Sequence, residues 1–267
     1  MMVSAVSKRY EDITVVAIYG DSRIRTALPA VQKTLDALPG SKPLLISNVS
    51  IATEWEQKPC APMSYEGYSE FTIYCLHQYI QTPYCLIVQH DGWAFSGENW
   101  NDDWLNYDYV GAPSHAALLP NGEYHVGYGW TDKAGAKVVQ NGGFSLRSKT
   151  FLEAPSVYGI TRWKVPEPTL LNEDVQLCCF MRPSLEDAGI KFCPDDKARY
   201  FSFEHLGPPH EGMDLRKVFG HHSRFRQLLS NNDVLWKMTQ EQMKQTPGEQ
   251  EIYDLFTDYY GHTVHMA

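Results

Sequence analysis

The sequence has no long hydrophobic run and none of the best-known catalytic motifs. No apolar stretch approaches the roughly 18 to 20 residues of a transmembrane helix, and the start, MMVSAVSKRYED, has no apolar signal core. The motifs GxxxxGK with Ser or Thr, GxGxxG after a strand, GxSxG and HExxH are also missing, so P-loop, dinucleotide, serine-hydrolase and zincin chemistries find no support. We therefore expect a cytoplasmic protein without a membrane span.

Cysteines and basic side chains are both few. The six cysteines form no CxxC pair and lie mainly in apolar stretches, which favours reduced thiols over a structural zinc site. The 23 basic side chains are outnumbered by 32 acidic ones, giving a formal net charge of −9. This charge opposes nonspecific binding to nucleic acid or to an anionic membrane surface.

The first third of the chain alternates predicted strands with predicted helices. Runs of buried-strand character occupy residues 13–20, 42–48 and 84–89, and apolar residues at helical spacing predict helices over about 24–38 and 65–79. This order favours an α/β fold with a parallel sheet and right-handed crossovers.

The remainder of the chain has a more mixed pattern. Residues 107–113 read as a short strand, 141–148 as a glycine turn with a short strand, and 172–189 as a helix interrupted or ended by Pro183. No Pro-, Gly- or Ser-rich linker divides the sequence. We expect one domain over residues 1–267, in which residues 223–267 form a mainly helical extension.

Three polar side chains follow the strand predicted over 84–89. In open α/β sheets ligands bind beyond the carboxyl ends of the strands, where Gln89, His90 and Asp91 lie. Asp91 can approach a divalent cation such as Mg²⁺ or Mn²⁺, although an Asp-Gly pair is more often a simple turn. His90 is expected to face away from the site.

Three further groups have both a chemical and a purely structural reading. Glu173 and Asp174 at a helix start serve either as cap and dipole compensation or as a general base. His221 and His222, if in a strand, face opposite ways, so at most one points into a given site. The glycine pair at 142–143 either lets backbone amides approach a ligand or makes a tight turn.

In their order and amino-acid sequence, these segments resemble a family of bacterial and viral proteins of unknown function. That family in turn resembles glycosyltransferases of the GT-A fold. The resemblance covers about residues 65–223 and rests on TPYCLIVQHDGWAF, DDWLNYDYVGAP, NGGFSLRS, NEDV, a stretch ending in FSFEH, and FGHHS. It implies a GT-A-like α/β domain whose single mixed, mostly parallel sheet is flanked by helices.

The resemblance also implies a metal-dependent glycosyltransferase that moves a sugar from a nucleotide-sugar donor to an acceptor hydroxyl with inversion. Asp91 matches the final acid of the DxD motif, which holds Mn²⁺ or Mg²⁺, and His222 matches a late histidine that completes the metal site. Gln89 stands where the first acid is expected, but its amide can still hydrogen-bond the ribose.

Other matched positions are assigned to the substrates. Glu173 and Asp174 match the acidic pair that supplies the base, with Asp174 favoured. The remaining candidates for donor binding are Arg23, Asn141, Gly142 and Gly143. For Arg23, a solvated surface arginine is the alternative.

Competing functions stay open at this point. One is an inactive sugar- or nucleotide-binding module, which is favoured by Gln89 standing where an acid is expected. Another is a sugar nucleotidyltransferase. A UDP-sugar donor is favoured, and for the acceptor a saccharide is favoured while a modified nucleic acid stays open. The sequence does not name the donor sugar or settle inversion against retention.

Overall fold

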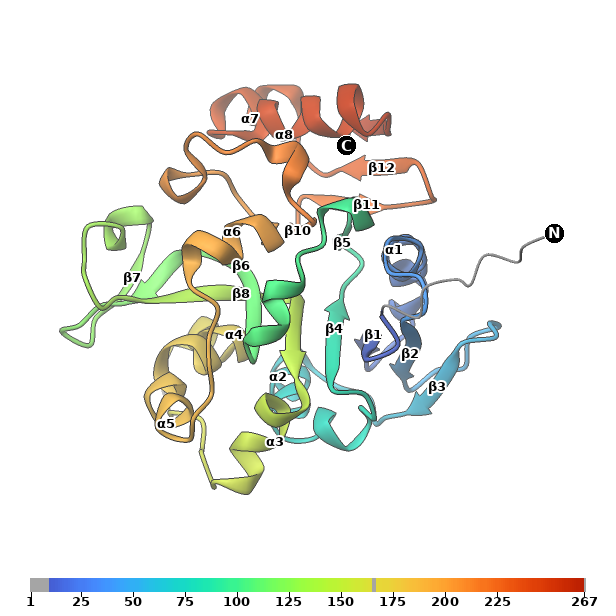
Figure 1. Cartoon of the computed structure of the whole chain (residues 1–267). Helices are drawn as coiled ribbons and strands as arrows, with labels where there is room; N and C mark the ends of the chain where they lie inside the picture. The colour runs from blue at the N-terminus through green and yellow to red at the C-terminus, as the bar shows by residue number, and fades with distance from the viewer. Residues whose placement is uncertain (1–9, 165–166, 267) are drawn as a thin grey trace.

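A large mixed sheet covered by helices on both faces forms the centre of the computed structural model, which describes residues 10–164 and 167–266 (Figure 1). Its seven strands lie in the order β3-β2-β1-β4-β8-β6-β7. Their bounds are β1 Ile13–Tyr19, β2 Lys42–Ser47, β3 Glu56–Pro59, β4 Tyr84–Val88, β6 Tyr109–Leu118, β7 Tyr124–Val126 and β8 Lys137–Ser148. The expected α/β class is confirmed.

The first half of the sheet is parallel and the second half is antiparallel. β1 pairs in parallel with β2 and β4, and β2 with β3, whereas β8 runs antiparallel to both β4 and β6. The expected single mixed sheet is therefore present, but it is less parallel than the sequence suggests. The cause is β8, which inserts between β4 and β6.

β8 also corrects the prediction of a glycine turn at 141–143. Residues 137–148 form one continuous strand with neighbours on both sides, so Gly142 and Gly143 lie in the interior of a sheet. Glycine in such a place marks a close approach by another part of the chain. The pairing with β6 is irregular between Gly111 and Ala117, opposite this stretch.

Two separate groups of buried side chains fix the helices to the sheet. Val15 and Ala17 of β1 face the core that includes α1, while Val16 and Ile18 face the core that includes α2 and α3. This alternation along one strand buries both faces of the sheet. The helices are α1 Ile24–Ala37, α2 Tyr65–Tyr74, α3 Lys149–Val157, α4 Glu173–Val175, α5 Arg182–Asp187, α6 Asp195–Phe201, α7 Gln240–Gln245 and α8 Glu249–Asp254.

Two small sheets complete the described structure. One joins β5 (Gly92–Ala94), β10 (Gly220–His222) and β9 (Ser202–Phe203), and the other joins β11 (Arg226–Leu228), β12 (Asp233–Trp236) and β13 (Thr263–Met266). The segment 223–267, expected as mainly helical, thus combines α7, α8 and a π-helical turn with a three-stranded sheet. In Figure 1 it is the orange-to-red region beside β5 and β10.

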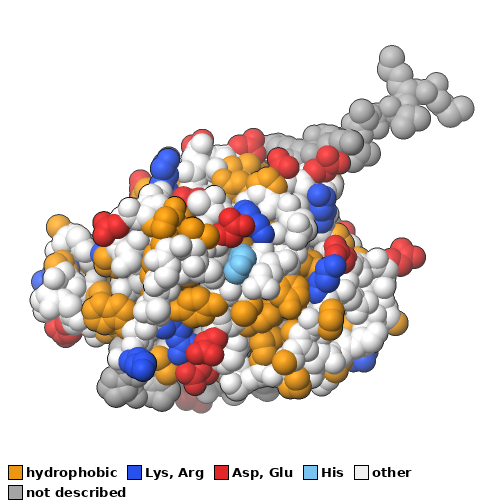
Figure 2. All heavy atoms as spheres, turned by 90° about the horizontal axis from the view of Figure 1, so that it is seen from below, with side chains coloured by type: hydrophobic (Ala, Val, Ile, Leu, Met, Phe, Trp, Pro, Cys, Tyr) orange, Lys and Arg blue, Asp and Glu red, His pale blue; other side chains and the backbone are white. Residues whose placement is uncertain are grey.

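The surface is mixed in character. On the face shown in Figure 2, acidic and basic side chains are interspersed with hydrophobic ones. Among the helices that the structure describes, none has the length and apolar content needed to cross a membrane.

Candidate functional site

A cavity of about 450 Å³ lies at the carboxyl ends of β1 and β4. Such a volume lies within the usual range for small-molecule sites. Most of the residues singled out in the sequence line it, namely Arg23, Gln89, Asp91, Asn141, Asp174 and His222. The structure therefore gathers side chains that are up to two hundred positions apart in the chain.

Asp91, His222 and Gln89 meet in this cavity. His222 Nε2 lies 3.2 Å from Asp91 Oδ1 and 3.2 Å from Gln89 Oε1. The antiparallel pairing of β10 with β5 sets His222 opposite Gly92 and so places its ring beside Asp91. Gln89 is held from its other end, because its Nε2 donates to the Tyr68 hydroxyl at 3.0 Å.

The Asp91–His222 contact is a buried ion pair. Burial opposes ionisation of Asp91, but the charge of His222 outweighs it and lowers the pKa of Asp91 to about 2. In the same way Asp91 overcomes the effect of burial and raises the pKa of His222 to about 9. Asp91 is 5% exposed, and its Oδ1 faces the rings of both His222 and His90.

This donor set fits a hard divalent cation. Carboxylate and amide oxygens with an imidazole nitrogen suit Mg²⁺ or Mn²⁺, and adjacent ligands of an octahedral ion at about 2.1 Å are about 3 Å apart, close to the separations found here. Asp91 Oδ1 and the His222 ring face each other at 3.2 Å, and an ion bound between them would displace the proton of His222. Within the described residues no group of three or more His, Cys, Asp or Glu side chains forms a metal cluster, so the amide of Gln89 would supply the third ligand.

The two adjacent histidines point in opposite directions, as expected for a strand. His222 reaches the cavity, whereas the His221 ring packs among aromatic rings, 4.1 Å from Trp93 and 5.0 Å from Phe256 between centroids. Burial lowers the pKa of His221 well below its usual value. His221 is thus a neutral core side chain, and His222 is the member of the pair beside Asp91.

His90 does not face away from the site, contrary to expectation. It lines the cavity, and its Nδ1 lies 3.0 Å from the Tyr19 hydroxyl and 3.5 Å from Asp91 Oδ1. The Tyr19 hydroxyl also accepts a hydrogen bond from the His90 backbone N–H at 2.9 Å. Tyr19 therefore ties the end of β1 to the loop that carries Asp91.

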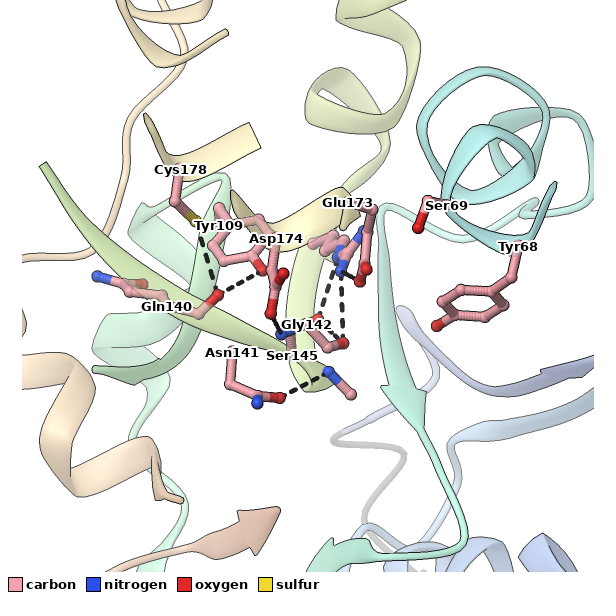
Figure 3. Close-up of polar contacts among 12 residues, drawn as sticks. Tyr68, Ser69, Tyr109, Gln140, Asn141, Gly142, Ser145, Glu173, Asp174 and Cys178 are labelled. Carbon is pink, nitrogen blue, oxygen red and sulfur yellow. Dashed lines mark hydrogen bonds and ion pairs between the residues drawn. The ribbon is translucent and has the colours of Figure 1, made fainter. Parts of the chain in front are cut away.

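The two consecutive acids of α4 have different surroundings. Figure 3 shows Glu173 and Asp174 on either side of the β8 segment around Gly142. Glu173 is buried and pairs with Arg147, whose NH2 lies 3.0 Å from Glu173 Oε1. Asp174 faces the cavity and contacts the Gly142 N–H at 3.4 Å. Only Asp174 is placed to reach a bound molecule.

The electrostatics of Asp174 suit a proton acceptor. Burial raises its pKa to about 7, with further contributions from the negative charges of Glu173 and Glu204. A carboxylate with a pKa near neutrality takes up and releases protons readily at physiological pH. Glu173 has a fixed partner in Arg147 and is not available for this task.

The glycine pair makes room for these side chains. A Cβ on Gly142 would lie 2.0 Å from Glu173 Oε1, and one on Gly143 would lie 2.2 Å from His222 Nε2. Asn141 Oδ1 accepts a hydrogen bond from the Gly143 N–H at 2.8 Å, which fixes the amide at the cavity wall. Gly142 and Gly143 thus lie directly behind the cavity as spacers rather than as part of a loop.

Arg23 lies at the rim. Its side chain is 70% exposed and pairs with Asp21 at 2.8 Å. Both the binding role and the surface role considered from the sequence are compatible with this position, since the side chain reaches the cavity edge and also contacts solvent.

Several cavity residues escaped the reasoning from sequence. They come mainly from β6, β7 and the segment after β9, and they include Tyr65, His115, Tyr124, Glu204 and Arg224. Glu204 was within reach, because it belongs to the FSFEH stretch. Tyr65 lies in the helix expected over 65–79, where a tyrosine at helical spacing indicates core packing, whereas His115 and Tyr124 stand in a stretch of weak periodicity that only the second half of the sheet brings to the cavity.

Comparison with known proteins identifies a family. Residues 59–222 match a family model described as "Protein of unknown function (DUF5672)", which confirms the expected membership of a family of unknown function. The matched span contains Gln89, Asp91, Asp174 and His222, whereas Arg23 and Arg224 lie outside it. No curated protein matches the chain.

Proposed function

We propose a function for this chain, which belongs to the DUF5672 family. It is a metal-dependent glycosyltransferase that moves a sugar from a nucleotide-sugar donor to an acceptor hydroxyl, with a GT-A-like fold. The observation that carries the proposal is the placement of a cation site (Asp91, His222 and Gln89) and a carboxylate of raised pKa (Asp174) in one cavity. The mixed seven-stranded sheet, with Asp91 just beyond β4, supports the fold assignment.

The donor is bound around Asp91. Asp91, His222 and Gln89 would hold a divalent ion, which would neutralise a diphosphate and make it a better leaving group. Arg23 and Arg224 line the same cavity and supply further positive charge to the phosphates or nucleotide. This local charge allows a protein of net charge −9 to bind an anionic donor, and we favour a UDP-sugar.

The acceptor hydroxyl is activated by Asp174. The hydroxyl oxygen forms a bond to the anomeric carbon, the bond from that carbon to the diphosphate oxygen breaks, and the diphosphate leaves with the electron pair. The proton of the hydroxyl passes to a carboxylate oxygen of Asp174, whose pKa of about 7 suits the transfer. Because the hydroxyl displaces the diphosphate in one step, the anomeric centre inverts in the proposed reaction.

A binding module without turnover is the second candidate. Gln89 favours it, because an amide in place of an acid leaves only one carboxylate at the cation site. Such a module binds the nucleotide-sugar and metal but neither hydrolyses nor transfers the sugar.

The test uses Mn²⁺ and a panel of UDP-, GDP-, TDP- and CMP-sugars. Thermal shift measures binding, and release of free nucleotide measures slow donor hydrolysis. We expect metal-dependent stabilisation by one nucleotide class, lost in Asp91→Asn and kept in the control Asp132→Asn, which changes an exposed acid. No response to any donor would overturn the proposal, and stabilisation without turnover would favour the binding module.

A further inference from the structure

Glu204 is an unused carboxylate in the cavity. It follows β9 directly, lines the cavity, and has a side chain that is 18% exposed. Among the described residues none donates a hydrogen bond to this carboxylate, and Nε2 of its neighbour His205, whose pKa burial lowers, lies 3.8 Å from Glu204 Oε1. A largely buried carboxylate without protein donors has its lone pairs directed to whatever fills the cavity.

The backbone at Glu204 is held firmly from behind. Arg226 NH2 donates to the Glu204 carbonyl oxygen at 2.8 Å, and Arg226 NH1 pairs with Glu249 Oε2 at 2.9 Å. Both charged groups of that pair are buried, and the guanidinium lies 5.0 Å from the centroid of the Trp236 ring. A carboxylate on such a support is preorganised for binding.

Flat rings stand near this carboxylate in the same cavity. Tyr124 lines it and stacks on Phe180 at 6.4 Å with an interplanar angle of 25°, which fixes the plane of the tyrosine. His115 also lines the cavity and contacts the His205 ring edge-on at 5.7 Å. An aromatic face beside a hydrogen-bond acceptor is the combination that suits the apolar face and the hydroxyl groups of a sugar ring.

Two of the carboxylates that line the cavity influence each other. Glu204 and Asp174 are close enough for the charge of Glu204 to help raise the pKa of Asp174. A third carboxylate, on the acceptor sugar, would be repelled by both and would give Glu204 no hydrogen-bond donor. A hydroxyl pair or an ammonium group would satisfy it.

We infer that Glu204 is the residue that selects the acceptor, and that the acceptor is a saccharide bearing hydroxyl or amino groups rather than an acidic sugar. This inference rests on the proposed glycosyl transfer and specifies its acceptor class. Glu204 accepts hydrogen bonds from two hydroxyl or amino groups of the acceptor sugar while the sugar ring lies against Tyr124. The reacting hydroxyl then faces Asp174.

The experiment compares three methyl hexosides that share one ring and differ in one group: a neutral sugar, its 2-amino form and its uronic acid. With the full chain, Mn²⁺ and the donor identified in the panel, we expect kcat/KM for the neutral and amino sugars to exceed that for the uronic acid by at least about tenfold. Glu204→Gln reduces this ratio to about threefold or less and raises KM for the neutral sugar more than it changes kcat. Glu241→Gln, which changes an exposed glutamate of α7, keeps the wild-type ratio.

Two outcomes overturn the inference: an unchanged ratio in Glu204→Gln, or a wild-type preference for the uronic acid. If Glu204→Gln fails to fold, Glu204→Asp takes its place, because it keeps the charge and shortens the side chain. An unchanged KM of Glu204→Asp for the neutral sugar would then count against a direct contact between residue 204 and the sugar. Saturation-transfer NMR of the three glycosides on the wild-type protein separates the two claims. If the glycosides bind with the expected preference but no donor is turned over, only the proposed function fails. If the donor is turned over but the preference is missing, only this inference fails.

Discussion

The two sides of the cavity each have a buried arginine–glutamate pair behind a cavity-facing carboxylate. Arg147 and Glu173, 3.0 Å apart, stand behind Asp174, and Arg226 and Glu249, 2.9 Å apart, stand behind Glu204. Both guanidinium groups are fully buried and lie 5.0 Å from the centroid of an aromatic ring. The first pair lies within the span that matches the family model, and the second lies outside it.

The two pairs differ in what they attach. Arg147 also donates to Ser145 Oγ and to the Gly142 carbonyl oxygen, so its pair is anchored in the central strand β8. Arg226 instead connects β11 and α8 to the segment after β9. Because desolvation offsets most of the Coulombic gain of a buried pair, neither pair is a strong source of net stability. Their contacts instead hold the chain at Glu173, next to Asp174, and at the carbonyl oxygen of Glu204.

The largest expected effect comes from breaking either pair. Arg147→Met and Arg226→Met each leave a buried glutamate without its partner, which costs about 3 to 5 kcal/mol in the free energy of unfolding. Urea denaturation measures this cost. Arg216→Met, which removes an exposed partner of Asp214, is the control and should change the free energy of unfolding far less. Equal, small losses in all three variants would contradict the distinction between buried and exposed pairs.

The next prediction is that substitutions of Glu173 and of Asp174 change the free energy of unfolding in opposite directions. Glu173→Gln leaves Arg147 unpaired and destabilises the protein by about 3 kcal/mol. Asp174→Asn removes a charge that burial disfavours, and we expect it to stabilise the protein by about 1 to 2 kcal/mol above pH 7 while abolishing sugar transfer. Both are measured by urea denaturation at several pH values.

The pH dependence follows from the raised pKa of Asp174. In the unfolded chain Asp174 ionises near its ordinary value, whereas in the folded protein it ionises near 7. The wild type therefore loses stability as the pH rises between these two values, and the penalty is complete above 7. The gain in Asp174→Asn should vanish toward pH 4, and a gain that persists there would argue against this assignment.

A smaller effect concerns the glycine beside each pair. In Gly142→Ala the new Cβ meets the Glu173 carboxylate, and in Gly248→Ala the residue must adopt a φ of +78° and contact the Leu206 side chain. Each change should cost about 1 to 3 kcal/mol in urea denaturation. Only Gly142→Ala should also reduce donor turnover in the fraction that stays folded, because the Gly142 N–H contacts Asp174.

The smallest effect links the two carboxylates through space. In the proposed mechanism transfer requires ionised Asp174, so kcat/KM should rise with pH and reach half its plateau near 7. Glu204→Gln removes one of the charges that raise this pKa, and the midpoint should move to lower pH by a few tenths of a unit. A pH–rate profile of both proteins with the neutral acceptor tests this, and a midpoint that moves upward would contradict it.

Much of the fold could be predicted where local patterns are strong. The β-branched run of β1 and the helical spacing of Ile24, Ala27 and Val31 made the first half of the sheet readable. β3 has the polar sequence EQKP and is mostly exposed, so no hydrophobic pattern marked it. β8 was misread at Gly142 and Gly143, because a glycine pair is typical of turns and the reason for it here is the side chains of Glu173 and His222 packed against it.

The sequence predicted most residues of the candidate site, but not how they are arranged. The resemblance brought Asp91 and His222 together in advance, and the structure places them 3.2 Å apart. It could not separate Glu173 from Asp174, since that depends on Arg147, twenty-six positions before Glu173 and without a local signal. Glu204 likewise depends on Arg226, which follows it by twenty-two positions.

The hydrogen bond from Arg226 to Glu204 has a consequence for the order in which the protein is made. The ribosome synthesises residues 59–222, including Asp91, Asp174, Glu204 and His222, before it reaches the arginine and the glutamate that support Glu204. The chain around Asp91, Asp174 and His222 is therefore made before the residues that hold Glu204 in place. The buried pair behind Glu204 forms only after α8 has been synthesised.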